Sequence, residues 1–213
     1  VFVQNTWNAS KVITLETGLR GDYQNAYGFF LLPRFSALLK LKQHFTSRIG
    51  GGLGYKTPTV FTEDGERIQF KNVLPIDVRN TNAEKSYGGN LDFNYRAGLF
   101  NGRVSLSINQ LFFYTRVNNP IVLTATANSN LEYLQPNGFI DTKGMETNIK
   151  LSYKNFKLFV GYTLADVKQH YITTTAFSLV ARHRLNNVLM YEIEDNLKIG
   201  LEAYYFSPQK LND

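Results

Sequence analysis

The chain has 213 residues, with 23 Lys and Arg, 17 Asp and Glu and no cysteine, giving a formal net charge of +6 and a mean hydropathy of −0.25. Without cysteine the sequence cannot form disulfides, thiolate metal sites or cysteine nucleophiles. Its basic residues are scattered rather than clustered, so we expect no nucleic-acid partner. It also has no run of about 18 apolar residues that would predict a transmembrane helix.

Aromatic residues make up 14% of the chain, with 13 Tyr and 16 Phe, and this favours strands because aromatic side chains fit a pleated surface. Alternation of apolar and polar residues, which is the period of a strand, dominates the sequence. It is clearest where Tyr87, Gly89, Leu91, Phe93 and Tyr95 fall on one face. In chain order it predicts strands over residues 1–8, 12–22, 35–41, 45–55, 86–96, 104–115, 142–153, 157–164, 185–191 and 197–205. The alternation fails at 110–113, where we expect a β-bulge.

The predicted connections alternate in length. Short turns are expected near residues 9–11, 42–44, 98–102, 154–156 and 194–196, and long links over 24–32, 56–84, 117–137 and 168–182. An up-and-down sheet with tight turns at one end and working loops at the other has this pattern, as outer-membrane barrels do. We therefore predict about ten antiparallel strands, most near the roughly 9–11 residues of a tilted membrane strand.

The two faces of the predicted strands differ in charge. One face is almost free of charge over about 25 Å, the height of a lipid-facing band. Tyrosines toward the ends of that face would form an aromatic girdle: Tyr55, Tyr87, Tyr95, Tyr153, Tyr162, Tyr191 and Tyr205. The other face carries charges and small polar residues and would line a filled, wet interior. A soluble β-sandwich gives the same alternation, with the apolar face as its core, and stays open as an alternative.

Several segments, in order, resemble a TonB-dependent receptor. They are LLPRFSALLK (31–40), GLGYKTPT (52–59), EKSYGGNLDFNYR (84–96), NQLFFYTRVNNPIVL (109–123), NGFIDTKGMETNIKLSY (137–153) and HRLNN (183–187). No single motif is specific, but the ordered set covers nearly the whole chain. The sequence pattern of these segments is similar to that of Bacteroidetes receptors.

The resemblance implies an all-β fold, an antiparallel up-and-down transmembrane β-barrel. About ten of its probable 22 strands would lie in this chain, around a lumen closed by a plug domain. Residues 1–213 would be part of one barrel domain, with the plug, the first strands and the last strands absent. A barrel fragment with open edges is expected to aggregate on its own.

The implied function is that of a bacterial outer-membrane receptor that binds a scarce nutrient and imports it with TonB energy. The nutrient would be a siderophore, corrinoid, metal chelate or glycan. The implied partners are outer-membrane lipid, the TonB complex through the missing N-terminal part, and the small-molecule or glycan substrate. The alternatives are a passive porin or structural barrel, or a soluble β-sandwich binding module.

Substrate contacts are expected in the long loops, where aromatic, amide and cationic side chains occur together. The candidate substrate-binding residues are Phe61, Arg67, Arg79, Tyr133, Gln135 and Asn137. The glycines of the GGGLG segment (50–54) do not have dinucleotide-binding spacing. They would mark either bends in the wall or close approach of a plug.

Catalytic chemistry is not expected. The sequence has three histidines, His44, His170 and His183. Their spacing is not that of metal ligands, and no serine or other nucleophile can be recognised as the partner of a histidine base. The acidic residues Glu63, Asp64 and Glu66 form an incomplete calcium-ligand series. We therefore predict no enzyme activity, no cofactor and no metal site.

Overall fold

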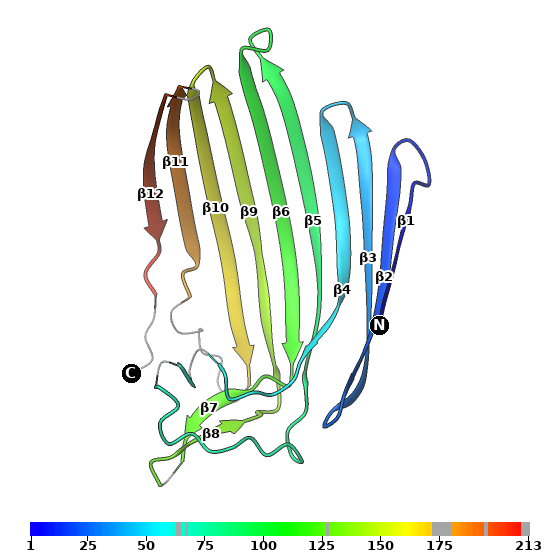
Figure 1. The fold of residues 1–213 in the computed structure, drawn as a ribbon, viewed down its shortest axis with the longest axis vertical. Coiled ribbons are helices and arrows are strands. Elements are labelled where there is room, and N and C mark those ends of the chain that lie inside the picture. The colour runs from blue at the N-terminus through cyan, green and yellow to red at the C-terminus, as the bar shows by residue number, and fades with distance from the viewer. Residues whose placement is uncertain (63–64, 67, 127, 172–179, 194–195, 210–213) are drawn as a thin grey trace.

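The computed structural model describes residues 1–62, 65–66, 68–126, 128–171, 180–193 and 196–209. Its main element is a 10-stranded antiparallel sheet (Figure 1). In sheet order the strands are β1 (Phe2–Trp7), β2 (Ile13–Gln24), β3 (Gly28–Lys42), β4 (Phe45–Lys56), β5 (Glu84–Leu99), β6 (Val104–Asn118), β9 (Phe139–Tyr153), β10 (Phe156–His170), β11 (His183–Ile193) and β12 (Leu197–Phe206). A separate hairpin consists of β7 (Val122–Ala125) and β8 (Leu131–Leu134). Across these described ranges, no helix is both long and apolar enough to span a bilayer.

The order of strands confirms the predicted up-and-down connectivity. In Figure 1 the tight turns that join β1 to β2, β3 to β4, β5 to β6 and β9 to β10 lie at the upper end of the sheet. Most of the predicted turn near 194–196 and most of the predicted link over 168–182 lie outside the described residues. The described residues of segment 57–83 and the strands of the β7–β8 hairpin lie together at the lower end. The central strands are longer than predicted, since β5 has 16 residues and β6, β9 and β10 have 15 each. Their extra residues lie mainly toward the loop end.

The predicted long link over 24–32 is wrong. β2 ends at Gln24 and β3 begins at Gly28, so residues 29–32 belong to a strand. The Gln24 side-chain oxygen accepts hydrogen bonds from the backbone N–H groups of Ala26 (2.7 Å) and Tyr27 (2.9 Å). Gly28 has a φ of 80°, which glycine adopts without steric cost. The strict alternation of short and long connections therefore fails at β2–β3.

The predicted bulge at 110–113 is also wrong. β6 pairs with β5 and with β9 without a register shift from Val104 to Asn118. Gln110 therefore lies on the apolar face and Phe113 on the polar face. The Thr147 hydroxyl donates to the Gln110 side-chain oxygen at 2.6 Å. The alternation appears broken because a polar residue, Gln110, lies on the apolar face and an apolar residue, Phe113, lies on the polar face. The hydrogen bond with Thr147 satisfies Gln110 there.

The register separates the two faces as the alternation predicted. Leu91, Phe112, Met145 and Leu164 are neighbours across four strands of the apolar face. Asn94, Asn109 and Asn148 are neighbours across the polar face, with a 2.9 Å bond from Asn109 to Asn94.

The apolar face has no second layer packed on it in the described part of the chain. Large apolar residues stay exposed there, including Leu201 at 69%. The buried hydrophobic residues are few: Phe30, Ala37, Ala83, Tyr133 and Ala181. A β-sandwich would bury its apolar face against a second sheet, so the sandwich alternative does not fit.

Candidate functional site on the polar face and at the loop end

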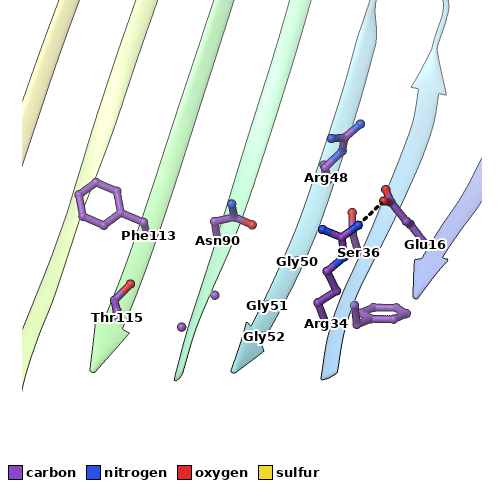
Figure 2. A pocket seen from close by; sticks show the side chains of 13 residues that line it. Glu16, Arg34, Ser36, Arg48, Gly50, Gly51, Gly52, Asn90, Phe113 and Thr115 are labelled. Carbon is purple, nitrogen blue, oxygen red and sulfur yellow. Dashed lines mark hydrogen bonds and ion pairs between the residues drawn. The ribbon is translucent and has the colours of Figure 1, made fainter. Parts of the chain in front are cut away.

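A hollow lined by glycine lies on the polar face over β2 to β6. Pairing places Gly52 between Arg34 and Gly88, and Gly50 between Ser36 and Asn90. Because these glycines carry no side chain, the face is recessed there into a hollow of about 470 Å³ (Figure 2). We call it the glycine hollow. The close-up shows the Arg34, Arg48 and Asn90 side chains arranged around its floor.

Larger residues would not fit the floor without moving the neighbouring strands. A Cβ atom on Gly88 would lie 2.8 Å from both the Tyr114 carbonyl oxygen and the Thr115 hydroxyl oxygen. A Cβ atom on Gly52 would lie 3.1 Å from the Pro33 carbonyl oxygen. The glycines thus permit close strand contact as well as a recessed surface.

The charges around the glycine hollow are only partly paired. The Arg34 guanidinium lies 3.4 Å from a Glu16 carboxylate oxygen and donates a 2.5 Å hydrogen bond to Gln4. Gln4 in turn donates to Glu16. Arg48, at the other side of the hollow, makes no hydrogen bond or ion pair within the described residues. The Arg48 guanidinium therefore has N–H donors free to bind whatever enters the hollow, with the Asp92 carboxylate opposite it on β5.

A second hollow opens where β3 and β4 separate. Proline has no N–H to donate, and the β3–β4 ladder ends at the pair Arg34–Gly52, next to Pro33. Beyond it lies a space of about 730 Å³. The Tyr55 ring stacks on Phe30 at 3.8 Å, and its hydroxyl donates to Asp22 at 3.1 Å. Tyr55 therefore makes contacts with polar-face residues rather than joining the predicted girdle.

The two long loops are joined at the opposite end from the tight turns. Tyr133 on β8 is 9% exposed, and its hydroxyl donates to the Val60 carbonyl at 3.1 Å while it contacts Thr62 at 2.6 Å. Gln135 bonds both the N–H and the carbonyl of Asn82 at 2.9 Å, and the Asn119 carbonyl at 2.8 Å. These contacts join the described residues of segment 57–83 to the β7–β8 hairpin, and we call the joined parts the loop cap.

The predicted substrate-binding residues have different environments. Phe61 is 73% exposed and lies edge-on to Phe70 at 5.7 Å. The side chains of Arg79 and Asn137 are exposed. Tyr133 and Gln135 are engaged in the internal bonds of the loop cap, and Arg67 lies outside the described residues. The substrate-binding role of all six stays a prediction.

Sequence reasoning did not single out Arg48 or Gly88 as site residues, nor Thr62 and Asn82 as loop partners. Strand alternation already placed Arg48 on the polar face, and its lack of a partner depends on the neighbouring strands. The bonds of Thr62 and Asn82 join segments far apart in the chain, for which a single sequence carries no signal.

The histidines lie far from one another in the fold. His183 accepts or donates a 2.9 Å hydrogen bond with the Tyr162 hydroxyl through Nδ1. His170 lies 3.0 Å from Asp141 and stacks on Phe139 at 4.3 Å. Among the residues that the structure describes, no group of three or more His, Asp or Glu side chains could hold a metal ion.

The family model of the "TonB dependent receptor-like, beta-barrel" matches residues 1–212. The chain belongs to the TonB-dependent receptor family. A search of curated proteins found no match.

Solved receptor structures share the fold of this receptor segment. The siderophore receptor PirA from Pseudomonas aeruginosa is 17% identical with a TM-score of 0.73, and the match covers 95% of this chain and 36% of PirA. The FrpB iron transporter from Neisseria meningitidis is 15% identical with a TM-score of 0.70, over 96% of this chain and 32% of FrpB. A mutant of the ferric enterobactin receptor PfeA from P. aeruginosa is 16% identical with a TM-score of 0.73, over 98% and 32%. The chain thus spans about a third of the length of these receptors.

Family membership assigns the two faces of the receptor segment. In a receptor barrel of the bacterial outer membrane the apolar face contacts lipid, and the polar face lines the lumen. The long connections are extracellular and the tight turns are periplasmic. The glycine hollow is therefore part of the lumen wall, and the loop cap lies at the extracellular end.

Proposed function

We propose that this chain is part of the wall of an outer-membrane receptor that captures a scarce nutrient and imports it with energy from the TonB complex. Of the nutrient classes that the family resemblance implies, an iron chelate has the strongest support. The printed names of the structural neighbours describe a siderophore receptor, an iron transporter and a ferric enterobactin receptor. A corrinoid, another metal chelate or a glycan has no such support, and the assignment to Bacteroidetes stays a prediction.

The observation that carries the proposal is the unpaired positive charge on the lumen wall. Within the described residues, the side chains of Arg48, Arg96 and Lys40 make no ion pair or hydrogen bond. Arg48 and Arg96 line one hollow of about 540 Å³, which also contains Asp92. The Asp92 carboxylate accepts a hydrogen bond from Asn94 and makes no ion pair with either arginine, so the two guanidinium groups outnumber it. Many ferric chelates are anionic, and a lumen lined by cations raises the local concentration of anions.

We place the first contact with the nutrient at the loop cap. Phe61, Arg79 and Asn137 have exposed side chains that a ligand can reach, and Arg67 belongs to the same proposed set. Tyr133 and Gln135 would act mainly by holding the loops in place. Rigid support of a binding loop lowers the entropy lost on binding.

We further propose that the glycine hollow receives the plug, the lumen-filling domain implied by the family resemblance. Its recessed floor lets another backbone approach the wall closely, and Arg48 offers a charge to an acidic group. The TonB complex would be contacted through the part of the receptor outside residues 1–213. The family consists of receptors and transporters, so we propose transport rather than catalysis as the role of this chain.

Uptake by the full-length receptor tests the proposal. Cells with and without the gene would be iron-starved and given radiolabelled ferric enterobactin or ferrichrome, each with and without a functional TonB. TonB-dependent uptake that is lost with the gene would support the proposal. Gene-dependent uptake that does not need TonB would point to the passive porin instead. Unchanged uptake of both chelates would remove iron chelates of these two classes as the nutrient.

A further inference from the structure

A cluster of charged residues lies on the lipid-facing side of the sheet, at the extracellular ends of β5, β6, β9 and β10. We call it the rim patch and define it by Lys85, Arg116, Asp141, Lys143, Asp166 and Lys168. Pairing places Arg116 between Tyr87 and Asp141, and Lys143 between Tyr114 and Asp166. The rim patch is on the same face as the apolar band, and therefore points away from the lumen.

The rim patch borders the apolar band directly. The next row toward the periplasmic turns holds Phe112, Met145 and Leu164. Adjacent rows on one face are about 7 Å apart, because successive side chains of a strand alternate between faces. The first charged residues therefore lie about 7 Å from the last residues that contact hydrocarbon, on their extracellular side. This is the depth of the lipid headgroups.

The cations of the rim patch outnumber its anions. Asp166 already pairs with Lys168 at 3.4 Å. Asp141 forms a 3.0 Å hydrogen bond with His170, which is an ion pair only when His170 is protonated. Lys85 and Lys143 are exposed and have no partner in the part of the chain that the structure describes. Arg116 has only neutral partners: its guanidinium lies 3.4 Å above the Phe139 ring, and its Nε donates to Asn118 at 3.0 Å.

The three cations without an ion pair in the described part of the chain lie on neighbouring strands, and Asp141 and Asp166 are opposite two of them, Arg116 and Lys143. Lys85 on β5, Arg116 on β6 and Lys143 on β9 are offset by one row each, so they form a diagonal across strands spaced about 4.8 Å apart. The same end of β2 and β3 has no such charges. There the lipid-facing residues are Tyr23 and Phe29, and the chain turns at once. The positive charge is therefore confined to the extended central strands.

We propose that the rim patch binds the phosphate groups of an anionic lipid in the outer leaflet. Lys85, Arg116 and Lys143 would contact the phosphates, while the acyl chains lie along Phe112, Met145 and Leu164. A phosphate oxygen is a strong acceptor for ammonium and guanidinium donors. A lipid satisfies both the cations and the apolar row beneath them, whereas free phosphate satisfies only the cations.

Lipid retention by the purified full-length receptor tests this proposal. Wild type, K85Q/K143Q and the control K40Q/K150Q would be placed in nanodiscs of phosphatidylethanolamine and titrated with bis-phosphorylated lipid A. Bound lipid A would be counted by native mass spectrometry. Lys40 and Lys150 lie on the lumen face, so the control removes the same charge from the other side of the wall. Heat-modifiability on gels would confirm that each variant is folded.

We expect K85Q/K143Q to bind lipid A about 30-fold more weakly, the effect of removing two cations near an anionic surface. The control should match wild type, and added salt should weaken wild-type binding. Single variants K85Q and K143Q should be intermediate. Equal retention by all variants, equal loss in the control, or displacement of lipid A by millimolar inorganic phosphate would each overturn the proposal. Lipid A retention tests the rim patch, and iron-chelate uptake tests the proposed function. The two can fail independently, because the rim patch lies outside the lumen.

Discussion

The hydroxyl groups of Tyr133 and Thr62 lie 2.6 Å apart, although 71 residues separate them in the sequence. Tyr133 donates its own proton to the Val60 carbonyl, so Thr62 is the donor to Tyr133. Gly65 leaves space for this contact, since a Cβ atom there would lie 2.9 Å from the Tyr133 hydroxyl oxygen. The pair therefore joins two of the long extracellular loops through their described residues.

Replacing Tyr133 by Phe should loosen both loops at once. The change removes one hydroxyl that is donor to Val60 and acceptor from Thr62, and costs about 1 kcal/mol of loop stability. Hydrogen exchange should become faster at Leu74 and Leu131, whose backbone N–H groups bond across the two segments. Tyr23→Phe is the matched control, because Tyr23 is 73% exposed. Faster exchange in one loop alone would show that the loops move separately.

Gly88→Ala should destabilise the barrel more than Gly161→Ala, and both glycines lie on strands that are paired on both sides. A Cβ atom at Gly88 meets the Tyr114 carbonyl oxygen at 2.8 Å, while a Cβ atom at Gly161 meets the Asn148 side-chain oxygen at 3.2 Å. We expect a loss of about 1–3 kcal/mol at Gly88 from overpacking against backbone. At Gly161 we expect a smaller loss, because the Asn148 side chain can move aside, or a gain of about 0.4–1 kcal/mol. Urea unfolding of the full-length receptor in detergent would measure both, and similar values would contradict this account of the glycine hollow.

The polar pair on the lipid-facing side should show strong coupling. Thr147→Val leaves the Gln110 side-chain oxygen without its 2.6 Å partner in a region without water, which should cost about 1–3 kcal/mol. Adding Gln110→Leu removes the unpaired group and should recover most of that loss. A double-mutant cycle from unfolding in lipid vesicles gives the coupling energy. Additive effects of the two changes would mean that the hydrogen bond contributes nothing.

Acid should loosen the turn at Asp77 in the loop cap. The Asn80 side chain, 2.6 Å away, and the Arg79 backbone N–H hold the pKa of Asp77 below its ordinary value. A lowered pKa means that the carboxylate stabilises the turn above the pKa of the unfolded chain. That contribution is lost as the pH falls through the folded pKa.

An NMR titration of the Asp77 carboxyl carbon would check this prediction. The inflection should lie below that of an unstructured aspartate. Asn80→Ala should move it upward, because the Asn80 side-chain bond is the largest cause of the shift. An inflection at the same pH in both proteins would remove Asn80 as the cause.

The alternation of residue types predicted most of the sheet because a β-barrel wall has two unlike surroundings. One side contacts lipid and the other a wet lumen, so apolar and polar residues alternate along each strand. It failed at residues 110–113, where Gln110 and Thr147 satisfy each other on the apolar face. It also failed at 24–32, where the predicted link includes the strand residues Phe29 and Leu31. Their strand pairing follows from the tight turn before Gly28.

The sequence by itself determined the strand order, the two faces and the family, because these depend on local periodicity and ordered motifs. Only the tertiary structure decided how the glycines of β4 and β5 form one hollow beside Arg48, and how Tyr133 and Gln135 join two loops. It also showed which cations of the rim patch lack a partner. Each of these depends on which residues of separate strands and loops become neighbours, and the pairing register across the whole sheet sets that.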